Sequence, residues 1–124
     1  MLGGKDAIAT IAVRDLEGAS RFYEDTLGLK PDGKQEPGAR SYRSGASRVL
    51  VYESQYAGSN KATAATWVVD DVEGIVKALK AKGVVFEHYD LPETTRKGDV
   101  HVAGSLKLAW FKDPSGNILA LVSR

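Results

Sequence analysis

Apolar residues recur along the chain in two spacings, one typical of strands and one typical of amphipathic helices. The clearest stretch runs from Leu106 to Val122, where two apolar runs of strand length flank the sequence Asp-Pro-Ser-Gly. Pro114 suits the second position of a type I turn, Asp113 can accept hydrogen bonds from the turn amides, and Gly116 tolerates a left-handed backbone. The stretch therefore predicts a β-hairpin. Both faces of its last strand are apolar, so we expect one to be covered by a helix and the other by a second sheet or a pocket.

A strand followed by a helix is predicted twice. Each unit has an apolar run, an aspartate at the helix N-cap, an acidic residue in the first turn and a glycine that stops the helix. The runs are 7–13 and 62–69, the caps are Asp15 and Asp71, and the stops are Gly28 and Gly83. The same offset separates the caps and the acidic residues that follow them, which indicates a duplicated supersecondary unit.

Further strands are predicted after each helix, so both halves follow the order β-α-β-β-β. They are 40–43, 47–53 and 84–89, followed by a long loop over 90–105 and the hairpin. We place the boundary between the halves at the Gly58-Ser59-Asn60 loop. The prediction is a single α+β domain, 1–124, made of module 1 (1–57) and module 2 (58–124).

Three stretches carry a resemblance to a known family. They are V-R-D-L-E…F-Y…L-G-L, V-D-D-V-E…L-K-A-K-G-V and the closing W-F-K-D-P-S-G-N-I-L-A-L. Together they resemble the vicinal oxygen chelate superfamily, which includes glyoxalase I, extradiol dioxygenases, and the bleomycin and fosfomycin resistance proteins. The resemblance covers essentially the whole chain. It implies two βαβββ modules whose curved mixed sheets enclose a cavity, and it implies a homodimer. A ferredoxin-like duplication is the alternative, and the extra strands after each helix count against it.

Enzymes of this superfamily usually hold a divalent metal with His and Glu side chains. The matching positions here carry only hydrocarbon: Ile8, Ala64, Ala120, and Leu50 or Val51. Such side chains cannot coordinate an ion, so we expect neither a metal nor a cofactor. His88, near the end of a strand, and His101, in the long loop, are interpreted as surface residues. A new metal site built from these histidines with Glu53 or Glu87 is the less favoured alternative.

A small apolar cavity floor suits the body of an organic ligand. Trp110 is the expected wall, because by resemblance it lies where resistance proteins of the family present a pocket aromatic; plain core packing is the alternative. Trp67 is expected to pack under the second helix. Tyr42 and Arg43 could also line the opening, because alternation alone does not say which strand face is inward. The predicted ligand-binding pocket consists of Trp110, Leu108, Thr10, Thr66, Ala64, Ala120, Tyr52 and His101.

Composition narrows the function further. The chain has 17 basic and 16 acidic residues, a formal net charge of +1 and no cysteine. Neither a nucleic-acid nor a membrane partner is indicated, and the basic cluster Arg40, Arg43 and Arg48 is interpreted as a solvated strand edge. The first residues lack the apolar core of a signal peptide, so we expect a cytoplasmic protein.

Two functions remain. The first is a metal-free protein that captures a hydrophobic or aromatic small molecule, as drug-sequestering members of the family it resembles do. The alternative is a metal-independent isomerase, cyclase or lyase-like enzyme that uses a carboxylate or histidine at the cavity rim. The sequence does not define its catalytic residues; the acid–base candidates are Glu53, His88, Asp90 and His101.

Overall fold

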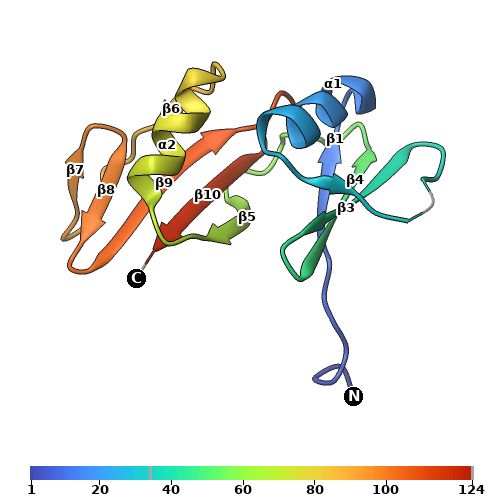
Figure 1. Ribbon diagram of the computed structural model, residues 1–124, viewed down its shortest axis with the longest axis horizontal. Helices are drawn as coiled ribbons and strands as arrows, with labels where there is room; N and C mark the ends of the chain where they lie inside the picture. The colour runs from blue at the N-terminus through green and yellow to red at the C-terminus, as the bar shows by residue number, and fades with distance from the viewer. Residues whose placement is uncertain (34, 124) are drawn as a thin grey trace.

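The computed structural model describes residues 1–33 and 35–123, which form two modules lying side by side (Figure 1). The first module contains β1 (Ala9–Val13), α1 (Leu16–Arg21), the π-helical η1 (Phe22–Thr26), β2 (Lys30–Pro31), β3 (Ala39–Ser44) and β4 (Ser47–Glu53). The second contains β5 (Thr63–Val68), α2 (Val72–Ala81), β6 (Phe86–Glu87), β7 (Thr95–Lys97), β8 (Val100–Ala103), β9 (Leu106–Lys112) and β10 (Ile118–Ser123). The predicted α+β class and the duplicated strand–helix unit are confirmed.

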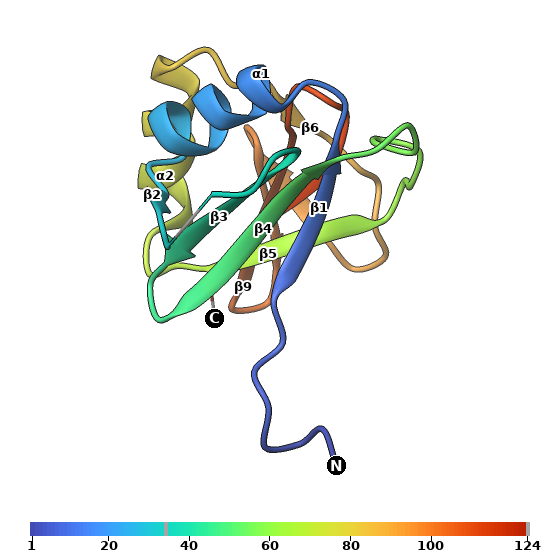
Figure 2. The same cartoon turned by 90° about the vertical axis from the view of Figure 1, so that its right-hand side faces the viewer.

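Each module builds its own mixed sheet. The strand orders are β1-β4-β3-β2 and β5-β10-β9-β8-β7, and β6 pairs with β9. In both sheets the first strand runs parallel to the last strand of its module, and the other pairs are antiparallel. From the side, the first sheet faces the viewer and β5 and β9 pass behind it (Figure 2). The two sheets do not close on each other around a cavity within one chain.

Both helical stretches begin and end where the sequence predicts, with Gly28 (φ 78°) after η1 and Gly83 (φ 91°) after α2, but the first stretch is divided. The Asp71 carboxylate accepts a hydrogen bond from the Gly74 amide at 3.0 Å, which caps α2. Asp15 occupies the same position before α1, in extended backbone and without a side-chain cap bond. The first helix then widens into η1, where the Leu27 amide donates to the Phe22 carbonyl at 2.9 Å. The predicted continuous helix to Gly28 is therefore two segments.

One hydrophobic core joins the helix-covered faces of both modules. Trp67 packs against this core beside Ile75 and Leu79 of α2, as predicted, and its indole N–H donates to Ser44 Oγ of the first module at 2.8 Å. The buried members that fill the core come from α1, η1, α2 and the inward sides of the strands. The largest are Tyr23, Tyr42, Phe111, Ile11, Leu119, Val13, Val51 and Val72.

The hairpin turn between β9 and β10 has the predicted chemistry. Asp113 Oδ1 accepts hydrogen bonds from the amides of Ser115 (2.9 Å) and Asn117 (2.8 Å). Gly116 takes a positive φ of 93°. The Asn117 amide group donates to the Ala12 carbonyl at 2.7 Å. The turn therefore also fastens the second module to the first strand.

The segment before the hairpin departs from prediction. The expected strand 84–89 shrinks to β6, and the expected loop 90–105 contains β7 and β8, a small hairpin that turns at Gly98 (φ +62°). The residues of β7 are polar and exposed, so no alternation of apolar and polar residues predicted this strand. Its pairing depends on the neighbouring strand β8, which in turn pairs with β9.

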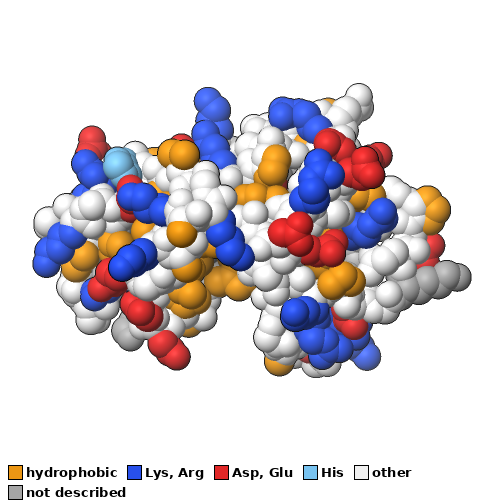
Figure 3. All heavy atoms as spheres, turned by 45° about the horizontal axis from the view of Figure 1, so that its top comes forward, with side chains coloured by type: hydrophobic (Ala, Val, Ile, Leu, Met, Phe, Trp, Pro, Cys, Tyr) orange, Lys and Arg blue, Asp and Glu red, His pale blue; other side chains and the backbone are white. Residues whose placement is uncertain are grey.

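The surface is mixed in charge. Basic and acidic side chains are interspersed over both modules on the face shown in Figure 3, in keeping with a formal net charge of +1. Among the residues that the structure describes, no helix is long and apolar enough to cross a membrane.

Candidate functional site

Each sheet has one face covered by helices and one open face. On β5, Ala65 and Trp67 turn toward the core, whereas Ala64, Thr66 and Val68 turn outward and are exposed. Val68 retains 78% of its surface. A β-branched apolar side chain this exposed, at the end of the edge strand β5, indicates a surface suited to contact with another molecule.

The open face of the second module gathers most of the predicted pocket. Thr66, Ala120 and Trp110 lie directly opposite one another across β5, β10 and β9. Leu108 pairs with Val122 on one side and with His101 on the other. Because directly paired residues share a face, this face carries six of the eight predicted residues: Trp110, Leu108, Thr66, Ala64, Ala120 and His101.

Trp110 forms the centre of an aromatic group on this face. Its ring meets the His101 ring edge-on, with centroids 4.8 Å apart, and the Tyr89 ring at 5.2 Å. Its indole N–H donates to Thr63 Oγ1 at 3.3 Å. A shallow pocket of about 210 Å³ lies beside it, lined by Lys61, Ala62, Thr63, Tyr89, Trp110 and Ile118. The ring is half-buried and lies outside the helix-side core, so the interpretation as plain core is wrong.

His101 is not the surface residue that the sequence suggested. It lies on β8, is fully buried, and its Nε2 accepts a hydrogen bond from the Tyr89 amide at 3.0 Å. Nε2 is therefore unprotonated and the proton belongs on Nδ1, which is buried without a hydrogen-bond partner among the described residues. Burial lowers the pKa of His101, and the charges of His88 and Arg96 also lower it, while the Leu108 and Tyr89 backbone acts the other way. The ring is neutral at pH 7.

His88 is a surface residue, as predicted. It directly follows β6, its side chain is 44% exposed, and its Nε2 lies 2.7 Å from Asp99 Oδ1. Lys80 of α2 contacts the other oxygen of the same carboxylate at 2.7 Å. Hydrogen bonds from Lys80 and His88 lower the pKa of Asp99. The contacts of Asp99 with His88 and Lys80 therefore connect the segment between β6 and β8 to α2.

Thr10 and Tyr52, the remaining two predicted residues, lie on the open face of the first sheet. Tyr52 is 38% exposed on β4, and its backbone partner on β1 is Ala12. Tyr42 points the other way: it is fully buried and its hydroxyl donates to Glu24 Oε2 at 2.8 Å. The structure thus assigns Tyr52 to the open face and removes Tyr42 from the candidates.

The two groups of candidate residues are not brought together in one chain. Thr10 and Tyr52 belong to one sheet and Trp110 to the other. Thr10, Tyr52 and Thr66 are exposed on these faces, whereas Ala120 and His101 are buried among their neighbours. An enclosed cavity between the two faces requires an additional surface.

The residues at the family's metal positions do not fit a metal. Ile8 and Ala64 are exposed hydrocarbon, Ala120 is a buried methyl group, and Leu50 and Val51 offer no donor atom. Within residues 1–33 and 35–123, no three His, Asp or Glu side chains are grouped closely enough to hold an ion. We therefore derive no chemistry through a metal at this site.

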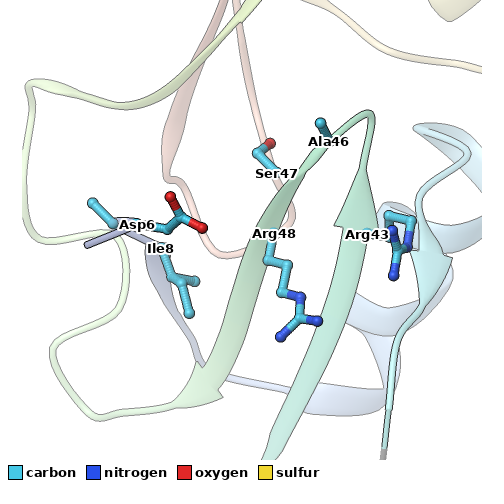
Figure 4. A pocket seen from close by; sticks show the side chains of 7 residues that line it. Asp6, Ile8, Arg43, Ala46, Ser47 and Arg48 are labelled. Carbon is cyan, nitrogen blue, oxygen red and sulfur yellow. The ribbon is translucent and has the colours of Figure 1, made fainter. Parts of the chain in front are cut away.

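Sequence reasoning missed Tyr89 and undervalued Arg43 and Arg48. Tyr89 follows a two-residue strand and reaches Trp110 only because β6 pairs with β9. Arg43 and Arg48 line a pocket of about 460 Å³ at the edge of the first open face (Figure 4). The alternation of β4, with Val49 and Val51 as its buried side, was the available signal for placing Arg48 on the same face as Tyr52.

These features define a protein with a duplicated βαβββ fold and two open sheet faces. The sequence model described as the Glyoxalase/Bleomycin resistance protein/Dioxygenase superfamily matches residues 6–121, and the chain belongs to this family. No curated protein matches it in sequence.

Solved structures share the fold across nearly the full length. A lactoylglutathione lyase from Agrobacterium tumefaciens is 17% identical with a TM-score of 0.72, covering 99% of this chain and 96% of that one. TnmS3, an antibiotic binding protein from Streptomyces sp. CB03234, is 20% identical with a TM-score of 0.66, covering 97% of each chain. A glyoxalase/bleomycin resistance protein/dioxygenase from Alicyclobacillus acidocaldarius is 21% identical with a TM-score of 0.70, covering 99% and 94%. At these identities the likeness establishes the fold alone.

Proposed function

We propose that this protein binds a small organic molecule with a hydrophobic or aromatic body, without a metal ion. The observation that carries the proposal is the row Thr66, Ala120 and Trp110, which presents an indole beside hydrocarbon where the family's metal ligands would project. A large rigid aromatic surface binds flat ligands at low entropic cost. Ligand sites of this kind combine apolar walls with a few polar groups, and Thr66 and Lys61 supply such groups here.

We further propose that a second copy of the chain completes the site. The open faces carry exposed apolar side chains, with Ile8 at 50% and Val68 at 78%. In the described residues, β1 and β5 each pair with a neighbour on one side only. Exposed apolar side chains on an open sheet face favour association. In a symmetric dimer each pocket would combine the Thr10 and Tyr52 face of one copy with the Trp110 face of the other.

A metal-independent enzyme is less well supported. A general base must have a free lone pair within reach of the substrate proton. The Nε2 lone pair of His101 is occupied by the Tyr89 amide, and its Nδ1 is enclosed. His88 engages Asp99 on the surface, outside the Trp110 row. Neither histidine is therefore placed to act as the general base, and the exposed carboxylates Glu53 and Asp90 are the candidates left for this alternative.

The test is a fluorescence titration with N-phenyl-1-naphthylamine, a neutral aromatic probe. We expect saturable binding, and Trp110→Ala should weaken it by about ten- to hundredfold, as loss of an aromatic anchor does. Trp67→Phe, a change on the opposite face of the same sheet, is the matched control and should leave the affinity unchanged. No saturable binding, or equal loss in both variants, would contradict the proposal.

The dimer has a separate test. Light scattering at micromolar concentration should give twice the chain mass, and Val68→Arg should shift it toward one chain mass while circular dichroism still reports a folded chain. Val68 is too exposed within the chain for its replacement to disturb the core. If light scattering gives a single chain mass for the wild-type protein, the proposed dimer is wrong.

A further inference from the structure

A pocket on the open face of the first sheet carries two arginines (Figure 4). It has a volume of about 460 Å³ and lies between the end of the β3–β4 hairpin and the segment that precedes β1. Its lining residues are Asp6, Ala7, Ile8, Arg43, Ala46, Ser47 and Arg48.

Arg43 and Arg48 are direct cross-strand partners on β3 and β4. Two like charges placed opposite each other destabilise a sheet unless an anion lies between them. Asp32 partly fills that role: its Oδ2 lies 2.8 Å from Arg48 Nε and its Oδ1 lies 3.4 Å from an Arg43 terminal nitrogen. The Asp32 amide donates to the Ser41 carbonyl at 2.9 Å, which extends the β2–β3 pairing and places the carboxylate beside this arginine pair.

Asp32 leaves one positive charge uncompensated. A guanidinium offers five N–H donors, and the Asp32 contacts use only one nitrogen of each arginine. The side chains of Arg43 and Arg48 remain 56% and 57% exposed, so their other donors are accessible from the pocket. Asp6 lines the pocket on the segment before β1 but forms no ion pair with either arginine in the part of the chain that the structure describes.

The arginine pair adjoins the half of the proposed pocket that Thr10 and Tyr52 line. Arg48, Leu50 and Tyr52 alternate along the open side of β4, and Thr10 is the direct partner of Leu50. Four residues of strand span roughly 13 Å. Because the Arg48 guanidinium reaches across β3 toward Asp32, an anionic group bound there would leave its apolar body free to lie over Leu50 toward the Tyr52 ring.

We infer that the ligand of this protein is an aromatic carboxylate whose carboxylate binds Arg48 and Arg43 while its ring lies toward Tyr52. This inference rests on the proposed function and specifies its ligand class. Arginine recognises carboxylates through paired, charge-assisted hydrogen bonds. Asp32 and Asp6 already bring two carboxylates to the two arginines, so a ligand with a single negative charge is favoured over a phosphate dianion.

Calorimetric titrations with 1-naphthoate and 1-naphthamide, which have the same ring system and nearly the same shape, test the inference. The wild-type protein should bind 1-naphthoate at least tenfold more tightly than 1-naphthamide. Arg48→Gln should remove that preference. It should weaken the binding of 1-naphthoate about ten- to hundredfold and leave the affinity for 1-naphthamide unchanged. Asp6→Asn should tighten 1-naphthoate, because it removes a negative charge from the pocket. Added salt should weaken the binding of 1-naphthoate but not that of 1-naphthamide.

The outcomes separate the two proposals. If N-phenyl-1-naphthylamine binds but 1-naphthoate shows no preference over the amide, the carboxylate inference is wrong and the aromatic-binding function stands. Tighter binding of 1-naphthyl phosphate than of 1-naphthoate would overturn the choice of a carboxylate. If neither the neutral probe nor either naphthyl compound binds, the proposed function itself is refuted. Melting temperatures show whether each variant is folded: Arg48→Gln and Asp6→Asn change exposed side chains, so both should melt close to the wild type.

Discussion

The hydroxyl of Tyr23 donates a hydrogen bond to Oδ2 of Asp113 at 2.8 Å, joining η1 of the first module to the hairpin turn of the second. Tyr23 is fully buried, and Asp113 is 4% exposed. Burial raises the pKa of Tyr23, and the neighbouring Asp113 charge and hydrogen bond raise it further, so the phenol stays protonated and keeps donating. The Asp113 carboxylate therefore organises its own turn and holds the two modules together.

Tyr23→Phe should lower the free energy of unfolding by about 1.5–3 kcal/mol, because it leaves a buried carboxylate oxygen without one of its donors. Asn117 continues to donate to the same oxygen at 2.8 Å, which limits the loss. Urea denaturation monitored by circular dichroism measures the change. Tyr56→Phe, at a position 71% exposed, is the control and should be neutral. Equal stabilities for the two variants would contradict the assigned role of the buried bond.

The sequence was sufficient for the parts of the fold that depend on local chemistry. Asp71 caps its helix, and Asp113, Pro114 and Gly116 build the predicted turn, because these residues act on amides only a few positions away. The strand 47–53 was predicted with its observed bounds, since its apolar run is flanked by turn residues. The β7–β8 hairpin was missed because its polar strand is stabilised by pairing with a neighbour rather than by its own pattern.

The sequence predicted which candidate residues share a strand face, but not how those faces are arranged in the folded chain. Alternation placed Trp110 and Leu108 together, and the structure agrees through their register with Ala120 and Val122. It could not show that His101 is enclosed by Tyr89 and Trp110, because that packing depends on the pairing of β6 and β8 with β9. Nor could it reveal how the modules are oriented, which separates Thr10 from Trp110 within one chain.

Gly58→Ala should be strongly destabilising. Gly58 has a positive φ of 71°. A Cβ added there would collide with the carbonyl oxygen of Ser115. That oxygen belongs to the backbone of the β9–β10 turn, so it cannot move aside without disturbing the turn. We expect a loss of more than about 2 kcal/mol, combining backbone strain with displacement of the turn. Gly45→Ala is the matched control, because Gly45 also has a positive φ (58°) but faces open space, and it should cost only about 1 kcal/mol. Thermal unfolding measures the stability loss of each variant. A larger loss for Gly58→Ala than for Gly45→Ala indicates a steric cost, and equal losses indicate a purely conformational one.

His101 should make the protein less stable in mild acid. Its pKa is lowered in the folded state, so the unfolded state binds the proton more readily and stability falls as the pH drops below the ordinary histidine value of about 6.5. Above that pH both states are neutral and the contribution is constant. The measurement is the urea midpoint of the wild type and of His101→Gln between pH 7.5 and pH 5. The wild type should show the steeper decline, and parallel curves would mean that His101 does not titrate as its burial requires.

The two tryptophans should respond differently to truncation, because they occupy opposite faces of the second sheet. Trp67 packs against the core and donates a partly buried hydrogen bond to Ser44 at 2.8 Å, so Trp67→Ala should cost about 3–5 kcal/mol of stability. Trp110 lies outside that core, and its longer bond to Thr63 is exposed. Trp110→Ala should therefore cost clearly less stability while losing most of the affinity for N-phenyl-1-naphthylamine. Melting temperatures and probe titrations on both variants give the comparison. A Trp110→Ala protein that is as unstable as Trp67→Ala but binds the probe normally would place the pocket elsewhere, with Tyr52 and the arginine pair as the next candidates.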